Sequence, residues 1–227
     1  MNPLQLRKII CSMPGIVSCW VPGSNRQAVD IVRGNHGTVH GANRNIEVYP
    51  NQIRNDLGWS FDGVDDYVNC GQIAALNNLS TSGKSFFSFC WIYTRASATE
   101  QRIFQQQDGS GLGRSWMYLD DSLRFTSYFS YPGLSSPNSL STNKYYFLAM
   151  TFDGSTQRLF ENGIEVASTS DSIPDADGDF LIGISKDLST DPFDGYITLI
   201  GVGDQNISQT EIFNLYNTTK DLFYPRG

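Results

Sequence analysis

The sequence predicts an all-β fold, and three observations support that prediction. Phe-Asp-Gly turns at residues 61–63 and 152–154 each lie beside segments in which apolar and polar residues alternate. Glu161-Asn162-Gly163 repeats the same kind of turn after the second of them. Such turns favour hairpins, because Gly and Asn adopt positive φ and Asp side chains bond to nearby backbone amides. Aromatic residues make up 13% of the chain, and they are favoured in strands and sheet cores.

The N-terminal part of the chain contains short strands between turn residues. Residues 1–13 suit a short helix or arm, which either packs on its own domain or projects toward a partner. An apolar strand begins at residues 16–20 and ends at the Pro, Gly, Ser and Asn of residues 22–25. Further β-structure is predicted as a hairpin over residues 39–49 and as strands over residues 59–61 and 67–68.

The middle of the chain contains the most apolar segment. Residues 85–93, SFFSFCWIY, are nearly all apolar, which is typical of a central strand buried on both faces. Residues 128–143 are rich in Ser, Pro and Gly and are predicted to form a long surface loop. Ser208 and Glu211 match a capping box, so the one secure helix is expected over residues 209–216. The remaining strands are predicted over residues 102–104, 116–119, 123–125 and 195–202.

Four segments, in the right order, resemble one known family. Residues 59–68, WSFDGVDDYV, are similar to the FDGvdDYV strand pair of laminin-G-like domains, within the concanavalin A-like lectin/glucanase superfamily. Residues 15–38 resemble the opening segment of that family, and residues 148–162 resemble its vAvTfDGst hairpin. Residues 193–216 resemble its closing segment. A single Phe-Asp-Gly match is weak, whereas four ordered matches are specific.

The resemblance implies a concanavalin A-like jelly-roll β-sandwich with one short C-terminal helix. The domain is expected over residues 14–217, between an N-terminal arm at residues 1–13 and a C-terminal tail at residues 218–227. A chain of 227 residues suits this organisation, since all-β sandwiches of about 200–250 residues are commonly single domains.

Charge and hydropathy exclude several function classes. The net charge is −7, from 16 basic and 23 acidic residues, with no basic run longer than Arg7-Lys8. Nucleic-acid binding needs clustered Lys and Arg, so it is not expected. Only three apolar residues follow that basic pair, which predicts no signal peptide, and no segment is long enough for membrane insertion. The four cysteines are expected to be reduced and buried, with a Cys70–Cys90 disulfide as the alternative.

The carboxylates argue against glycoside hydrolysis, which members of the superfamily perform. Retaining hydrolases need two carboxylates about 5 Å apart, as an E-x-D-x-x-E strand supplies. That motif is absent, and no G-x-S-x-G nucleophile motif is present. His36 lies in a Gly-Asn-His-Gly turn, where a structural hydrogen bond is expected. The chain is therefore predicted not to be an enzyme.

Two sets of residues are candidates for binding. No cofactor is predicted except calcium, for which Asp62, Asp65 and Asp66 are the best ligands. The alternative is that Asp62, Asp153 and Asp194 stabilise their own turns through side-chain hydrogen bonds. The second set would bind glycan through aromatic rings and a neighbouring amide, although burial in the core is the alternative for each. It comprises Trp116, Tyr118, Tyr128, Tyr131 and Asn138.

These observations lead to a non-enzymatic binding or assembly protein. Laminin-G-like domains usually act outside cells, yet no export signal is apparent. A phage virion structural protein, such as a head decoration protein or a tail-associated adhesin, is compatible both with action outside cells and with the lack of an export signal. Its partners would be a protein in a larger assembly, a glycan or both, with homo-oligomers as a further expectation. The alternatives are a carbohydrate-binding module, with or without calcium, and, third, a glycoside hydrolase.

Overall fold

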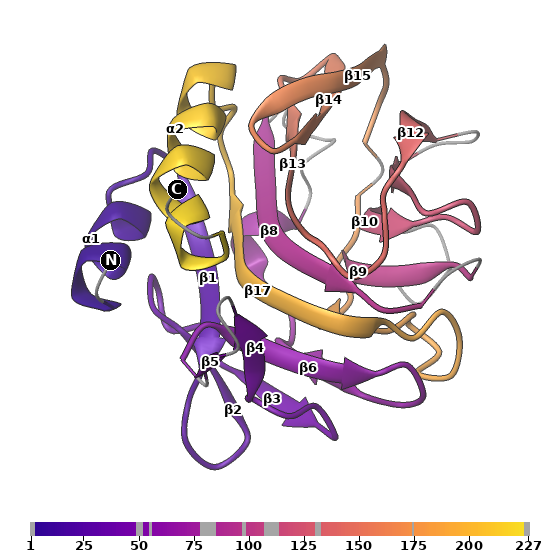
Figure 1. Ribbon diagram of the computed structural model, residues 1–227. Helices are drawn as coiled ribbons and strands as arrows, with labels where there is room; N and C mark the ends of the chain where they lie inside the picture. Colours follow the sequence, from indigo (N-terminus) through magenta and orange to yellow (C-terminus); the bar gives the residue numbers. More distant parts are fainter. Residues whose placement is uncertain are drawn as a thin grey trace.

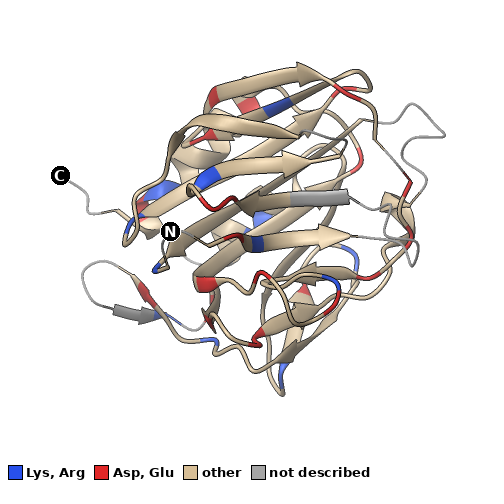
Figure 2. Cartoon of the chain, turned by 90° about the vertical axis from the view of Figure 1, so that its right-hand side faces the viewer, with Lys and Arg blue, Asp and Glu red and all other residues tan. Residues whose placement is uncertain are grey.

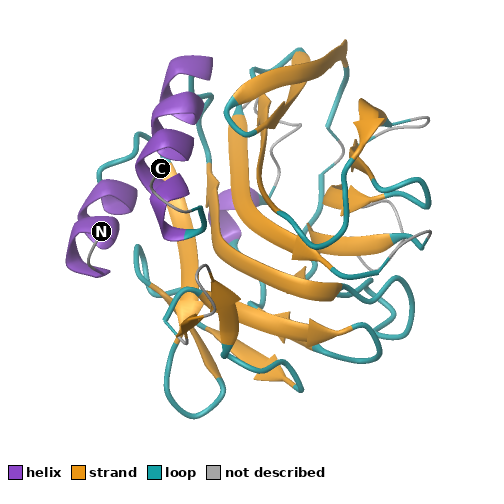
Figure 3. Cartoon of the chain, in the orientation of Figure 1, coloured by secondary structure: helices purple, strands orange, loops and turns teal. Residues whose placement is uncertain are grey.

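The computed structural model of the protein describes residues 3–48, 52–54, 56–77, 85–96, 99–106, 114–129, 133–173 and 175–224. For residues 3, 52, 53 and 114–116, only the backbone is described. Most of the regular secondary structure of the described part is β-structure, as Figures 1 and 3 show. The predicted all-β class is therefore confirmed.

The first strands are β1 (Ile16–Pro22), β2 (Gln27–Asp30), β3 (Gly37–His40), β4 (Ile46–Val48), β5 (Gln52–Arg54), β6 (Gly58–Asp62), β7 (Tyr67–Asn69), β8 (Phe86–Thr94) and β9 (Gln101–Gln106). They are followed by β10 (Arg114–Leu119), β11 (Arg124–Tyr128), β12 (Leu134–Ser139), β13 (Tyr145–Phe152), β14 (Thr156–Glu161), β15 (Ile164–Ser170), β16 (Phe180–Ile182) and β17 (Asp194–Gly203). The helices are α1 (Pro3–Cys11) and α2 (Gln209–Thr219), with short 3-10 helices η1 (Ala74–Leu76) and η2 (Lys220–Leu222).

The strands form one antiparallel sheet that rolls up on itself. Its order within the described residues is β12-β11-β10-β9-β16-β7-β3-β2-β1-β17-β8-β13-β14-β15, with β6 paired to β17. The strands near its two ends meet, because β12 lies against β14 and β15. β4 and β5 form a separate hairpin. The rolled sheet gives the two layers of the predicted jelly roll (Figure 1).

Two hydrophobic cores lie on the two faces of β8. We call the first the inner core; it lies between the layers and includes Trp20, Phe61, Phe86, Phe104, Phe125 and Leu159. The second, the outer core, lies between the sheet and the helices and includes Leu6, Ile10, Phe87, Phe89, Trp91, Phe147, Ile212 and Phe223. Side chains alternate between the faces of a strand, so successive residues of β8 enter different cores. The predicted burial of this strand on both faces is confirmed.

The two helices cover the outer core. α1 and α2 lie beside each other next to β1 and β17 (Figure 1). Ile10 of α1 and Ile212 of α2 are fully buried. α2 begins with the predicted capping box, in which Ser208 Oγ accepts a hydrogen bond from the Glu211 amide and the Glu211 carboxylate accepts one from the Ser208 amide. The predicted C-terminal helix is confirmed and extends to Thr219.

The turn prediction was correct at two sites and wrong at a third. Asp153-Gly154 joins β13 to β14, and Asn162-Gly163 joins β14 to β15, both as hairpins. Asp62-Gly63 does not close a hairpin, because β6 pairs with β17 whereas β7 pairs with β3 and β16. This turn instead carries the chain between strands that are distant in the sheet. Local residues specify a turn, but they do not specify which strands pair across it.

The predicted loop at residues 128–143 contains a strand. β12 occupies residues 134–139 and pairs with β11. Pro137 is compatible with this strand because β12 lies at one end of the sheet order, where a residue without an amide hydrogen is tolerated.

The cysteine prediction was largely correct: all four cysteines are free and three are buried, but Cys11 is exposed.

Candidate functional site

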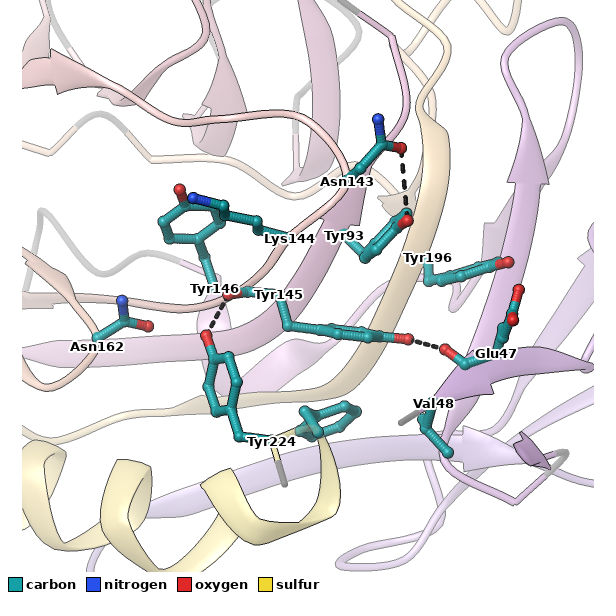
Figure 4. Close-up of a pocket in the computed structure, with 11 residues that line it drawn as sticks. Glu47, Val48, Tyr93, Asn143, Lys144, Tyr145, Tyr146, Asn162, Tyr196 and Tyr224 are labelled. Carbon is teal, nitrogen blue, oxygen red and sulfur yellow. Dashed lines mark hydrogen bonds between the residues drawn. The ribbon is translucent and has the colours of Figure 1, made fainter. Parts of the chain in front are cut away.

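A cavity of about 510 Å³ opens where β8 ends and where β13 and β17 begin, on the face that carries the outer core (Figure 4). We call it the tyrosine pocket. It is lined by Glu47, Val48, Tyr93, Asn143, Lys144, Tyr145, Tyr146, Asn162, Tyr196, Phe223 and Tyr224. Five of these residues are tyrosines, so the lining combines apolar ring faces with polar hydroxyl groups.

The floor of the pocket is a row of three tyrosines on adjacent strands. Tyr93 of β8 lies directly opposite Tyr145 of β13 on one side and Tyr196 of β17 on the other. Directly opposite residues lie on the same face of a sheet, so the three rings lie side by side. The Tyr93 ring centre lies 5.1 Å from that of Tyr145 and 5.2 Å from that of Tyr196.

The sequence of β8 explains why the tyrosine row places a polar hydroxyl group, that of Tyr93, at the end of the outer core. The side chains of β8 on this face are Phe87, Phe89, Trp91 and Tyr93, in order along the strand. The first three are buried under the helices, whereas Tyr93 is only partly buried. A tyrosine suits that position, because its ring packs on the core while its hydroxyl reaches solvent. The outer core therefore ends in an accessible aromatic surface.

Two separate segments form the walls and hold Tyr145. The Tyr145 hydroxyl donates a hydrogen bond to the backbone carbonyl of Glu47, the middle residue of β4. The Tyr224 hydroxyl donates to the backbone carbonyl of Tyr145, from the C-terminal segment (Figure 4). The Phe223 ring centre lies 4.8 Å from that of Tyr145. Tyr145 is thus fixed on both sides, and the shape of the pocket depends on both walls.

Polar groups at the rim complete the lining. The Tyr93 hydroxyl donates to Asn143 Oδ1 over 3.4 Å. Outside the lining itself, the Arg95 guanidinium lies 5.3 Å from the ring centre of Tyr196. Lys144 and Glu47 are exposed, so an ammonium and a carboxylate border the opening. The arrangement offers aromatic surface for packing and both donors and acceptors for hydroxyl groups.

Three tyrosines of the pocket, Tyr93, Tyr145 and Tyr224, should resist ionisation. Burial raises the pKa of Tyr224 to about 12, and burial also raises the pKa values of Tyr145 and Tyr93. An unfolded tyrosine has a pKa near 10, so the folded state retains these protons more strongly. The stability that this provides is complete below about pH 10 and is lost as the pH rises toward 12. A near-ultraviolet absorbance titration should show this delayed tyrosine ionisation, and ionisation of all tyrosines near pH 10 in the folded protein would contradict it.

Three of the predicted glycan residues, Tyr118, Tyr128 and Asn138, lie in the opposite layer. Tyr118 of β10 and Tyr128 of β11 are diagonal neighbours and are partly buried, while Asn138 on β12 is exposed. The Tyr118 ring packs under the Arg102 guanidinium, 4.6 Å from its ring centre, and burial raises the pKa of Tyr118 to about 12. The side chain of Trp116 and all of Tyr131 lie outside the described residues. Glycan binding by this set remains a prediction.

The structure brings the predicted calcium ligands together. Ligand atoms of Asp62, Asp65 and Asp66 all lie within 4.8 Å of one another. Two of the three also hold the turn, because Asp62 Oδ1 accepts from the Val64 amide and Asp66 Oδ2 accepts from the Asp62 amide, each over 2.9 Å. Burial raises the pKa of Asp66.

The alternative role of aspartates in their own turns is confirmed at two of three positions. Asp62 accepts from an amide of its own turn, as described above, and Asp153 accepts from the amides of Ser155 and Thr156. Asp194 differs, because its carboxylate pairs with Arg95 at 2.8 Å. His36 has the expected structural bond, accepting from the Asp30 amide at 3.1 Å.

Comparison with known proteins agrees with the fold. Residues 62–213 match the family described as the concanavalin A-like lectin/glucanases superfamily. The sequence matches no curated protein. Trypanosoma rangeli sialidase in complex with 2,3-difluorosialic acid gives a TM-score of 0.71 at 13% identity, over 98% of this chain and 38% of the sialidase. Domain 4 of AbnA, a GH43 extracellular arabinanase from Geobacillus stearothermophilus, in complex with arabinotriose, gives a TM-score of 0.57 at 17% identity, over 79% of this chain and 87% of that domain.

The comparisons contradict the prediction that the chain is not an enzyme. Similar solved structures include sialidases and a domain of an arabinanase, so the fold is related to folds in glycosidases. At 12–17% identity, the TM-scores of 0.71 and 0.57 establish a shared fold alone. The chain spans 38% of the length of the sialidase that it matches. The absence of one carboxylate motif was thus insufficient to separate this chain from such enzymes.

Proposed function

The chain belongs to the concanavalin A-like lectin/glucanases superfamily, and on this basis we propose that it is a carbohydrate-binding domain whose ligand occupies the tyrosine pocket. The in-register row of Tyr145, Tyr93 and Tyr196 is the observation that carries this proposal. Three neighbouring rings form an aromatic floor of the kind on which the apolar face of a sugar ring packs.

The dimensions of the floor favour an oligosaccharide. Adjacent strands lie about 4.8 Å apart, so the row across three strands spans about 10 Å. The hydroxyls of Tyr93 and Tyr224 and the amides of Asn143 and Asn162 line the same cavity. These groups supply donors and acceptors for sugar hydroxyls on either side of the rings. The domain of AbnA described above was solved with arabinotriose, which supports an oligosaccharide as the ligand class.

A glycan array identifies the ligand, and variants locate its site. Tyr196→Ala should reduce binding of every glycan that the unmodified protein retains, because it removes one end of the aromatic floor. Tyr118→Ala, on the opposite layer, tests the surface predicted from the sequence. Loss of binding in Tyr118→Ala with retention in Tyr196→Ala would place the site on that surface and contradict our proposal.

The predicted role in a phage virion finds no support in the comparisons. Within the described residues, the helices are too short and too polar to cross a membrane. A protein partner, homo-oligomer formation and location in a virion remain predictions. A carbohydrate-binding domain is compatible with an adhesin, and binding of purified protein to virion components would test that setting separately.

Calcium binding by Asp62, Asp65 and Asp66 also remains a prediction. Their carboxylate oxygens are the type of ligand that calcium prefers, and Asp65 is the member for which no role in the turn is described. If calcium binds there, isothermal titration calorimetry should detect it, and Asp65→Asn should weaken it about tenfold or more. Asp121→Asn, at an exposed carboxylate in another turn, is the matched control. An absence of binding heat at millimolar calcium would contradict the prediction.

A further inference from the structure

A second cavity, of about 520 Å³, lies beside the turn that joins β1 to β2. Its lining includes Arg26 from that turn and Arg44 from the segment before β4. We call it the arginine cavity. Its other polar lining includes Asn25 and Asn43, and the buried Trp59 contributes an aromatic side. None of the residues that line it belongs to the tyrosine pocket.

The turn holds Arg26 in a costly backbone conformation. The Gly23 amide donates to the Gln27 carbonyl over 2.8 Å, which closes the turn. Asn25 and Arg26 have φ of 52° and 57°, both in the left-handed region. A turn of this kind favours Asn followed by Gly, because a larger side chain is disfavoured at the second position. Arg26 therefore stands where glycine would be more stable, and such strained positions concentrate at binding sites.

The two arginines of the cavity differ from five other arginines of the described residues, which are paired with carboxylates. Arg54, Arg95, Arg102, Arg124 and Arg158 each form an ion pair with a carboxylate. Across the described residues, Arg26 and Arg44 form no such pair, and Arg44 Nη1 donates to the Gly23 carbonyl over 3.0 Å. Figure 2 shows basic and acidic residues interspersed over the strands. In a chain of net charge −7, two cations without an acidic partner at one cavity indicate an anionic ligand.

The arginine cavity and the tyrosine pocket lie along one row of the sheet. Asn43 forms a β-bridge with Ser60, and Ser60 lies opposite Tyr196. Asn43 is therefore two strand spacings, about 10 Å, from Tyr196. Asn43 lines the arginine cavity, while Tyr196 lines the tyrosine pocket. The two cavities are therefore neighbours in the sheet, with Trp59 of the arginine cavity packed in the inner core and Tyr196 of the tyrosine pocket packed against the outer core.

We propose that the arginine cavity binds the carboxylate of an acidic sugar, so that the ligands of this protein are acidic oligosaccharides. A guanidinium binds a carboxylate with two parallel hydrogen bonds, and the amides of Asn25 and Asn43 can bind the sugar hydroxyls. This inference rests on the proposed function, since it extends the glycan site beyond the tyrosine pocket.

Glucuronic acid and glucose are suitable probes, because they differ in the carboxylate that the arginines would recognise. Addition of glucuronate to the ¹⁵N-labelled protein should shift the resonances of Asn43 and the Trp59 indole, whereas glucose should leave them unchanged. Arg26→Gln combined with Arg44→Gln should weaken glucuronate binding about tenfold or more. Arg33→Gln, at an exposed arginine outside both cavities, should leave it unchanged.

Three results would overturn the inference: equal shifts with glucose, undiminished glucuronate binding in the double arginine variant, or equally strong binding of acetate, which would indicate a general anion site. A neutral oligosaccharide from the array separates this failure from failure of the proposed function. Suppose that the neutral ligand shifts the resonances of Tyr93 and Tyr196 while glucuronate shifts none. The proposed glycan site in the tyrosine pocket is then retained, and the proposed acidic subsite is rejected.

Discussion

Replacement of Trp91 by alanine should lower the free energy of unfolding by about 3–5 kcal/mol. The side chain is fully buried in the outer core, and its ring centre lies 4.6 Å from that of Phe223 and 5.6 Å from that of Phe147. Its indole Nε1 donates to Thr219 Oγ1 over 2.9 Å. Truncation would leave a cavity between sheet and helix and would remove the partner of a buried hydroxyl.

Urea denaturation followed by circular dichroism measures this loss. Phe213→Ala is a matched control on α2, because Phe213 is 45% exposed and should cost under about 0.5 kcal/mol. Trp91→Ala should also lower the affinity of the tyrosine pocket for its ligand, because Phe223 packs on both Trp91 and the pocket residue Tyr145. A destabilisation below about 1 kcal/mol would show that the helices and the C-terminal segment do not depend on Trp91.

Replacement of Tyr93 and Tyr196 together by alanine should weaken oligosaccharide binding at least about hundredfold. The two rings occupy adjacent positions in the floor, and loss of a ring at the centre of a binding site typically costs about 2 kcal/mol. Each 1.4 kcal/mol corresponds to about tenfold in affinity, so two rings account for about hundredfold or more. Isothermal titration calorimetry with the best glycan from the array provides the measurement.

Two controls separate binding from folding. Tyr67→Ala removes a partly buried tyrosine that stacks on His40 outside the pocket, and it should leave the affinity unchanged. Replacement of Tyr93 and Tyr196 by phenylalanine keeps the rings and removes the hydroxyls, so it should lower the affinity less than alanine does. Full affinity in the double alanine variant, with an unchanged unfolding transition, would contradict the assignment of the floor.

Local features of the fold were predictable from the sequence. The capping box at Ser208 and the hairpin turns at Asp153-Gly154 and Asn162-Gly163 depend on residues close together in the chain, and the structure confirms them. The Asp62-Gly63 turn shows the limit of this reasoning. Its residues specify a turn, but the pairing of β6 with β17 depends on contacts with residues far along the chain.

The candidate site could not be predicted from the sequence either, because it too depends on the pairing of strands that are far apart in the chain. Tyr93, Tyr145 and Tyr196 lie on separate strands, and only their pairing register places them side by side. A shift of one residue in either pairing would turn one ring to the opposite face. The apolar run of β8 did predict burial on both faces, yet it did not indicate that helices would cover one of them and leave Tyr93 accessible.

A crystal structure with an oligosaccharide selected on the array tests most directly whether the tyrosine pocket binds glycan. We expect a sugar ring stacked on Tyr93 or Tyr196, with its hydroxyls within hydrogen-bond distance of Asn143, Asn162 or the hydroxyl of Tyr224. A ligand bound beside Tyr118 and Tyr128, with the tyrosine pocket free of sugar, would contradict this assignment.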